Sequence, residues 1–355
     1  MSEGMYLYVY ILLFSVFSWP VIRFLGVGDC KKAYFIINYS LLFLVSALRT
    51  ENVGGDTLTY TQAFSSLNEI VIDGYITNGF EVGYIIFEYF LSLFSNDGQL
   101  IIVATSFIVI FGVGVFFYKT SENLWMPTAF YIGLNLFVDM MTPLRQSLSA
   151  ILLLWGVYYL AQGKQIKYLL FNLFAVTFHF SAVAFFLFMF LRKSKNIILI
   201  IVGIHLFVFL LLNGLSDQLL FLLLFDKYSD YANQVNSLGF GIIRAPIIFV
   251  ISAFTIAIVW KRCFKTELFF SVTCISAIIS MCGAIMLLIG YKVPFLSRLS
   301  YTYMLFFCLL PSVVINKISP VHKTIIIPIV LVSLTGLLIF SLMNSASYNN
   351  YESIL

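Results

Sequence analysis

The stretch AYFIINYSLLFLVSALRTENVGGDTLTY, residues 33–60, contains both kinds of chain from which this protein is built. Residues 33–48 are almost entirely apolar, which is typical of a membrane helix. Residues 49–60 follow at once with an arginine, two acids, a pair of glycines and a tyrosine. The pattern predicts a helix that ends at a membrane surface, with reactive side chains just beyond its end.

The composition extends this interpretation to the whole chain. Of the 355 residues, 61% are hydrophobic and 10% are charged, whereas a soluble domain carries about 25% charge. Apolar runs of about 17–25 residues recur, and each can cross roughly 30 Å of hydrocarbon as a helix. We therefore expect an all-α, polytopic membrane protein of about 10–12 transmembrane helices, with one domain over residues 1–355.

Hydropathy and the positions of lysine and arginine predict the spans and their direction. The predicted spans are 5–25, 33–48, 100–118, 124–141, 143–161, 197–213, 241–260, 268–290, 299–316 and 324–343. Two further stretches, 81–95 and 166–191, are short or interrupted. All of the basic loops lie in the cytoplasm only if both stretches return to the side where they began. We therefore expect re-entrant or interfacial segments there, with both termini outside.

On this orientation the large outer loops are 49–80 and 214–240. The alternative topology counts 81–95 or 166–191 as a span and puts a basic loop on the wrong side. The five cysteines have no CxxC spacing, so neither a disulfide nor a metal site is expected. No P-loop, HExxH or paired-acid metal motif is present, so we expect no metal and no cofactor. No run of basic and aromatic residues indicates nucleic acid.

Four arginines lie on four different elements that face the predicted outer side. An arginine at the centre of a membrane helix costs roughly 2.5–3.5 kcal/mol, and positive residues are disfavoured outside. Repeated arginines there favour an anionic ligand, since guanidinium groups bind phosphate bidentately and keep their charge. The alternative is that each reaches the interface and pairs locally. The four are Arg49, Arg145, Arg244 and Arg298.

Acids, a histidine and tyrosines accompany these arginines. The pair Gly54-Gly55 permits a tight turn, so Asp56 is expected to approach Arg49, either as a base or in an ordinary surface ion pair. Glu81 opens one interrupted stretch, and His179 lies at the break in the other, where it could take a proton from a hydroxyl. The tyrosines expected near the outer face are Tyr60, Tyr84, Tyr228, Tyr231 and Tyr301. Such rings belong to an interfacial belt or bind sugar.

Short blocks spread along the chain resemble the EpsG/Wzy-like O-antigen and exopolysaccharide polymerases of bacterial inner membranes. The blocks are LRTENVGGDTLTYTQAF (48–64), FEVGYIIFEYF (80–90), MTPLRQSLSAILLLWG (141–156), LFAVTFHFSAVAF (173–185), DKYSDY (226–231) and LSRLSYTYMLFFCLLP (296–311). Each block alone is weak, but their order and spacing are similar to those of the family. Thr57 and Ser147 depart from the family pattern without removing a charge.

The resemblance implies a glycosyltransferase that joins undecaprenyl-diphosphate-linked oligosaccharide units on the periplasmic side of the inner membrane. It implies membrane lipid and a chain-length regulator protein as partners. The four arginines would then bind the diphosphate, Asp56, Glu81 and His179 would be the catalytic candidates, and the tyrosines would contact sugar. The reaction would be inverting and metal-independent. The alternatives are an O-antigen ligase, which differs in its acceptor, and a transporter or flippase of the lipid-linked oligosaccharide.

Overall fold

A computed structural model describes residues 3–67, 79–192, 196–214, 239–260, 268–290, 294–344 and 351–354. Within these ranges the regular elements are helices, and an isolated β-bridge joins Arg49 to Ser353. The all-α prediction is confirmed. The chain divides into two compact units: unit 1 holds residues 1–160, 164–186 and 324–355, and unit 2 holds residues 161–163 and 187–323. The prediction of a single domain stays a prediction.

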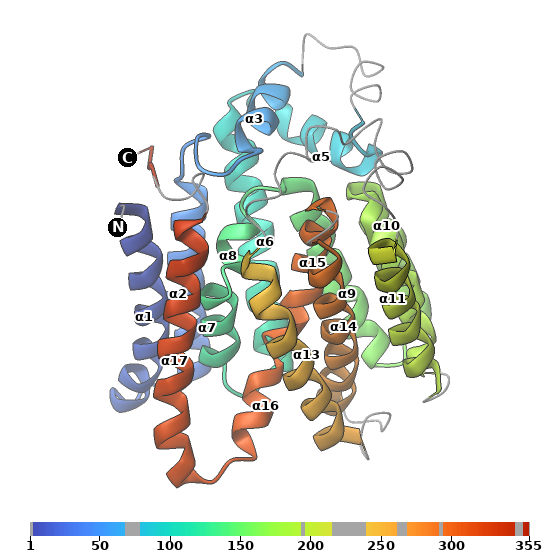
Figure 1. Cartoon of the computed structure of the whole chain (residues 1–355). Coiled ribbons are helices and arrows are strands. Elements are labelled where there is room, and N and C mark those ends of the chain that lie inside the picture. The colour runs from blue at the N-terminus through green and yellow to red at the C-terminus, as the bar shows by residue number, and fades with distance from the viewer. Residues whose placement is uncertain are drawn as a thin grey trace. The chain divides into compact units, whose positions relative to one another are not determined.

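Unit 1 is a helical bundle with two short helices across one end (Figure 1). Its helices are α1 (Glu3–Phe24), α2 (Cys30–Ala47), α3 (Thr57–Ser65), α5 (Val82–Ser92), α6 (Gly98–Thr120), α7 (Trp125–Gly133), α8 (Leu136–Asp139), α9 (Leu144–Ala161), α10 (Gln165–Phe178) and most of α17 (Pro320–Met343). Helix α6 packs against α2, α3, α5 and α7, so it is the central element of the unit.

Unit 2 is organised around α14 (Leu268–Gly290), which packs against four other helices of the unit. The others are α11 (Asn196–Gly214), α13 (Gly239–Val259), α15 (Pro294–Phe307) and α16 (Leu310–Asn316). The η1 helix (Phe180–Arg192) begins in unit 1 and ends in unit 2. Cys274 on α14 is disulfide-bonded, so the expectation of no disulfide is wrong. Sequence spacing alone does not show which thiols the fold brings together.

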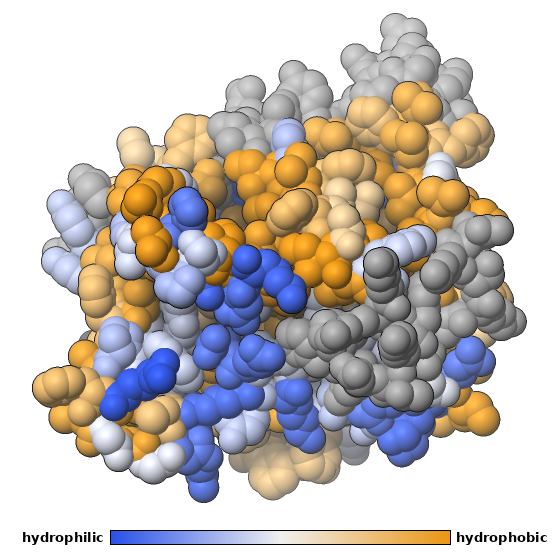
Figure 2. All heavy atoms as spheres, turned by 90° about the horizontal axis from the view of Figure 1, so that it is seen from below, coloured by the Kyte–Doolittle hydropathy of each residue, from blue (hydrophilic) through white to orange (hydrophobic). Residues whose placement is uncertain are grey.

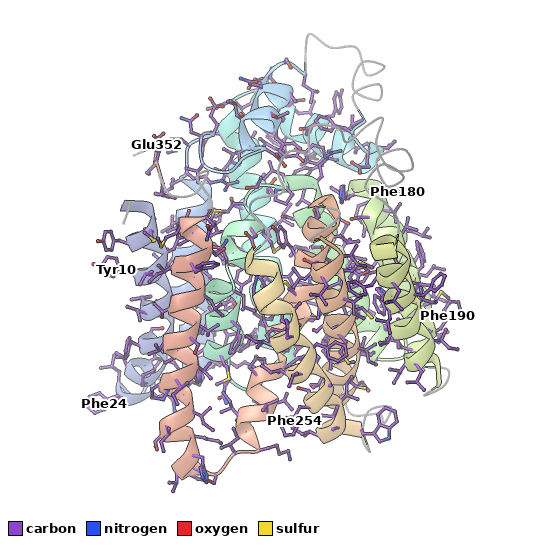
Figure 3. The ribbon with its side chains drawn as sticks, viewed as in Figure 1. Tyr10, Phe24, Phe180, Phe190, Phe254 and Glu352 are labelled. Carbon is purple, nitrogen blue, oxygen red and sulfur yellow. The ribbon has the colours of Figure 1, made fainter. Side chains whose placement is uncertain are left out.

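Six helices in the described ranges are long and apolar enough to cross a membrane, so the polytopic prediction is confirmed. They are Gly4–Phe24, Gly98–Thr120, Leu144–Ala161, Ser271–Gly290, Leu299–Asn316 and Pro320–Met343. Large apolar side chains point away from the helices that carry them, as lipid-facing residues do. On α1, for example, Tyr10 and Phe24 are 66% and 90% exposed (Figure 3). The count of 10–12 spans stays a prediction.

One predicted span is interrupted. The stretch 124–141 forms α7 and α8, which are separated at Asn135. Asn135 has a φ of 65° and donates from its amide to the Asp139 carboxylate at 2.9 Å. Asparagine tolerates this left-handed conformation because its short polar side chain bonds locally. The break separates α7 from the short helix α8, which ends at Asp139, shortly before α9 begins at Leu144.

The two uncertain stretches both behave as short or folded-back segments. Helix α5 has 11 residues, about 16 Å at 1.5 Å per residue, and cannot cross the membrane. Helix α10 and η1 form an antiparallel hairpin, in which the Tyr168 hydroxyl donates to the Phe185 carbonyl. The Asn172 side-chain amide donates to the Ala182 carbonyl at 3.0 Å. The chain thus folds back at His179, and the prediction that 166–191 is re-entrant or interfacial stays a prediction.

Lysines of unit 1 gather at the end opposite α3 and α5. The Lys31 ammonium donates to the Ser121 carbonyl at 2.7 Å and lies 4.7 Å from the centre of the Tyr118 ring. Lys119 lies over Trp155, and Lys164 and Lys167 lie over Tyr159. Figure 2 views the molecule from this end and shows hydrophilic residues beside hydrophobic ones. The arrangement is the one that the positive-inside orientation requires, although sidedness itself stays a prediction.

Replacement of Gly83 by alanine is expected to separate α5 from α10. A Cβ at Gly83 would lie 2.3 Å from the Thr177 hydroxyl oxygen and 2.8 Å from the Thr177 carbonyl oxygen. Overpacking of this kind typically costs about 1–3 kcal/mol. The matched control is Gly336→Ala on α17, where nothing lies within 4 Å of the added Cβ. Thermal unfolding in detergent should show a lower Tm for Gly83→Ala only, and an equal Tm for both variants would contradict the close contact.

Candidate functional site

Arg145, in the first turn of α9, is the centre of a polar cluster at the α3–α5 end of unit 1. Its Nη1 donates to the Glu81 carboxylate at 2.6 Å and to the Gly79 carbonyl at 3.1 Å, and its Nε donates to the Tyr60 hydroxyl at 3.3 Å. A guanidinium has five N–H groups. Within the described part of the chain, these contacts use those of Nε and Nη1 and leave the two of Nη2. The Arg145 side chain is 20% exposed.

Aromatic rings form a floor beneath this guanidinium. Its central carbon lies 4.6 Å from the centre of the Phe80 ring and 5.7 Å from that of Tyr60. Phe80 and Tyr60 stack with their centres 6.0 Å apart, and Tyr84 meets both of them edge-on. Aromatic faces attract cations and fix the plane of a guanidinium. The floor therefore holds Arg145 in one orientation. Helix α3 contributes Tyr60 to this arrangement, α5 contributes Tyr84 and α9 contributes Arg145 itself.

Glu81 connects Arg145 to His179. One carboxylate oxygen pairs with Arg145, and the other accepts from the Phe180 amide at 3.0 Å and lies 3.1 Å from the His179 Nδ1. Burial alone would raise the pKa of Glu81, but the hydrogen bond from His179 and the charge of Arg145 outweigh it and lower this pKa to about 2. A carboxyl whose pKa is lowered in the folded state stabilises that state when it is ionised. The contribution of Glu81 to the free energy of unfolding is therefore present above the ordinary carboxyl pKa of 4.5 and is lost as the pH falls towards 2.

The end of α10 sets the orientation of His179. His179 is extended, with φ −159° and ψ 122°, so it ends the helix and starts the turn into η1. Because a carboxylate only accepts, Nδ1 carries the proton and donates to Glu81. Nε2 is then an acceptor, and no group in the described part of the chain hydrogen-bonds to it. The ring is 29% exposed. This is the arrangement of an imidazole that takes a proton from a bound hydroxyl.

Arg49 lies inside the bundle, with 1% of its surface exposed. It donates to the Ser46 carbonyl, to the Ser46 and Ser106 hydroxyls at 3.1 and 3.2 Å, and to the Met141 carbonyl at 2.8 Å. It also lines a small cavity of about 10 Å³. Met141 precedes Arg145 by one helical turn, so Arg49 ties the end of α2 to the start of α9. Its predicted binding of diphosphate stays a prediction.

Gly54 and Asp56 shape the turn that leads to Tyr60. Gly54 has a φ of +103°, and a Cβ there would lie 2.6 Å from the Thr57 hydroxyl oxygen and 2.8 Å from that of Thr142. Only glycine fits such a turn at low cost. Asp56 is the N-cap of α3, and its carbonyl accepts from the Tyr60 amide at 3.3 Å. The turn thus places Tyr60 beside Arg145, and the predicted approach of Asp56 to Arg49 stays a prediction.

The other predicted residues lie in unit 2 or outside the described residues. Arg244 on α13 is buried, and Tyr301 on α15 is half-buried. The Arg298 side chain, Tyr228, Tyr231 and most of loop 214–240 lie outside what is described. Phe80 and Gly79 were missed, although they precede Glu81 directly. No group of three His, Cys, Asp or Glu suited to a metal ion occurs in the described part of the chain.

Comparison with known families identifies the chain. The sequence model of one family, described as the EpsG family, matches residues 32–353. The chain belongs to the EpsG family. A search of curated proteins and a search of solved structures found no match. The protein is thus an EpsG-family, multi-pass membrane protein implicated in exopolysaccharide biosynthesis. The matched range includes each residue of the Arg145 cluster.

Proposed function

We propose that this EpsG-family protein is a glycosyltransferase that polymerises undecaprenyl-diphosphate-linked oligosaccharide units at the periplasmic face of the bacterial inner membrane. The observation that carries the proposal is the cluster of Arg145, Glu81 and His179 at one end of unit 1. Among the described residues, it combines a cation that has donors to spare with an oriented imidazole that has a spare acceptor. Transfer of a glycan from a diphosphate needs both groups close together.

In the proposed reaction, a hydroxyl of the next lipid-linked unit attacks the anomeric carbon of the growing chain. His179 takes the proton of that hydroxyl on Nε2, and Glu81 stabilises the imidazolium that forms. A C–O bond forms at the anomeric carbon while its bond to the diphosphate oxygen breaks. Because attack comes from the face opposite the leaving group, the anomeric centre is inverted. The proton then passes from His179 to solvent.

The leaving undecaprenyl diphosphate takes the bonding electrons and gains negative charge. Arg145 Nη2 supplies donors to that charge, while the aromatic floor and the Glu81 pair keep the guanidinium in place. Donors fixed before the reaction stabilise developing charge without reorganisation. Glu81, with a pKa of about 2, is a weak base, so it orients His179 rather than accepting the hydroxyl proton. His179 is therefore the proposed base, and Glu81 its orienting partner.

The test is elongation by the purified full-length chain in lipid nanodiscs. We expect lipid-linked oligosaccharide to be converted into a ladder of longer lipid-linked chains, with release of undecaprenyl diphosphate and in the presence of a divalent-metal chelator. Transfer onto a different acceptor, such as lipid A-core, would instead show a ligase. Movement of the unmodified substrate across vesicles without diphosphate release would show a flippase and contradict the proposal.

A further inference from the structure

A second carboxyl group lies behind the Arg145 cluster, and the proposed reaction does not use it. Glu88 is on α5, with none of its surface exposed. Neither of its carboxyl oxygens has a hydrogen-bond partner within the described part of the chain, and the buried Tyr84 hydroxyl one turn earlier has none either. An ionised carboxylate is costly in such a place. A protonated carboxyl needs one acceptor, and the Tyr84 hydroxyl lies beside it.

Tyr84 connects Glu88 to the guanidinium of Arg145. Its ring is fully buried, and its centre lies 5.8 Å from that of Tyr60 and 5.7 Å from that of Phe80. Those two rings are the floor beneath Arg145. The tight contact of Gly83 with Thr177 holds α5 against α10, so Tyr84 has little freedom to move. A change at Glu88 is therefore transmitted to the orientation of Arg145.

We propose that Glu88 is a positioning residue, which in its protonated form holds Tyr84 beneath Arg145 and on ionisation weakens diphosphate binding at Arg145. The inference rests on the proposed function, because it concerns the ligand of that same site. With Glu88 neutral, the charges of Arg145 and Glu81 balance. With Glu88 ionised, an uncompensated negative charge lies near the anion site and repels a diphosphate.

The electrostatics of the site favour the protonated form near neutral pH. Burial raises the pKa of Glu88 to about 8, although the nearby Tyr84 hydroxyl and the charge of Arg145 act to lower it. Glu88 thus holds its proton below that pH and releases it above. Helices α6 and α10 pack against α5. Their titratable groups are Asp97, Tyr118 and Lys119 on or capping α6, and Lys164, Lys167, Tyr168 and His179 on or capping α10.

The first experiment measures elongation against pH for the full-length chain, Glu88→Gln and Tyr84→Phe. For the unmodified chain, we expect KM for the lipid-linked donor to rise about tenfold between about pH 7 and pH 9.5, with little change in kcat. Glu88→Gln should keep the low KM across the range. Tyr84→Phe removes a group that lowers the pKa of Glu88, so the rise should move to higher pH. An unchanged pH profile in Glu88→Gln would overturn the proposal.

The second experiment separates this inference from the proposed function. Infrared difference spectra of the unmodified chain against Glu88→Gln should show a protonated carboxyl at about pH 7 that disappears by about pH 9.5. Absence of that band at neutral pH overturns the inference even if the chain polymerises. If the chain does not polymerise, binding of farnesyl diphosphate is measured instead. Affinity that falls with pH in the unmodified chain but not in Glu88→Gln then supports the inference.

Discussion

Replacement of Arg145 by glutamine is expected to lower kcat/KM for elongation by about 10²–10³-fold, the usual cost of removing one fixed donor from a developing anion. Glutamine keeps part of the side-chain length but has no charge and one amide group. Arg145→Lys should also lose most activity, since an ammonium cannot donate to Tyr60, Glu81 and a phosphate in the same plane. Cells carrying either variant should accumulate single repeat units on the lipid carrier.

The matched control for this variant is Arg23→Gln. Arg23 is exposed in the last turn of α1, so the change removes the same charge far along the bundle from the cluster. We expect normal chain-length ladders from Arg23→Gln and none from Arg145→Gln, with equal amounts of both proteins in the membrane. A normal ladder from Arg145→Gln would remove the basis of the proposed function.

The sequence was enough to predict the class of fold and the end of the molecule where polar groups gather. Apolar runs and short basic loops predicted a helical membrane protein whose stretch 166–191 folds back, and the hairpin at His179 agrees. These are local or periodic signals, which one sequence carries by itself. The interruption at Asn135 had a local signal as well, an asparagine within an apolar run, but hydropathy alone treats that run as continuous.

The sequence could not predict which polar residues meet. Glu81 is 64 residues from Arg145 and 98 from His179, so their contacts depend on how α5, α9 and α10 pack. Arg49 shows that the sequence also could not predict which polar residues are buried. The pattern placed it at a helix end, facing outward, yet it lies inside the bundle because carbonyls of Ser46 and Met141 accept from it. Whether a guanidinium faces solvent or the core is decided by neighbours distant in sequence.

Replacement of His179 by glutamine is expected to lower kcat by about 10²–10⁴-fold, the usual contribution of a positioned general base. Glu81 stays ionised throughout the range of assay because its pKa is lowered to about 2. Steady-state elongation in lipid nanodiscs measures this loss, and an unchanged kcat in His179→Gln would contradict the proposed role of its imidazole as the base. The control is His322→Gln, an exposed histidine that contacts Ser319 in the loop before α17.

Replacement of Glu81 by glutamine tests whether Glu81 and His179 act as a unit. The amide cannot hold the Nδ1 proton as a carboxylate does, and it leaves Arg145 without its ionic partner, so activity should fall by a similar factor. Because both changes disable the same oriented imidazole, the double variant should be little worse than the poorer single one, as for groups that act together. Independent, multiplicative losses would mean that Glu81 serves Arg145 alone and that His179 takes the proton without it.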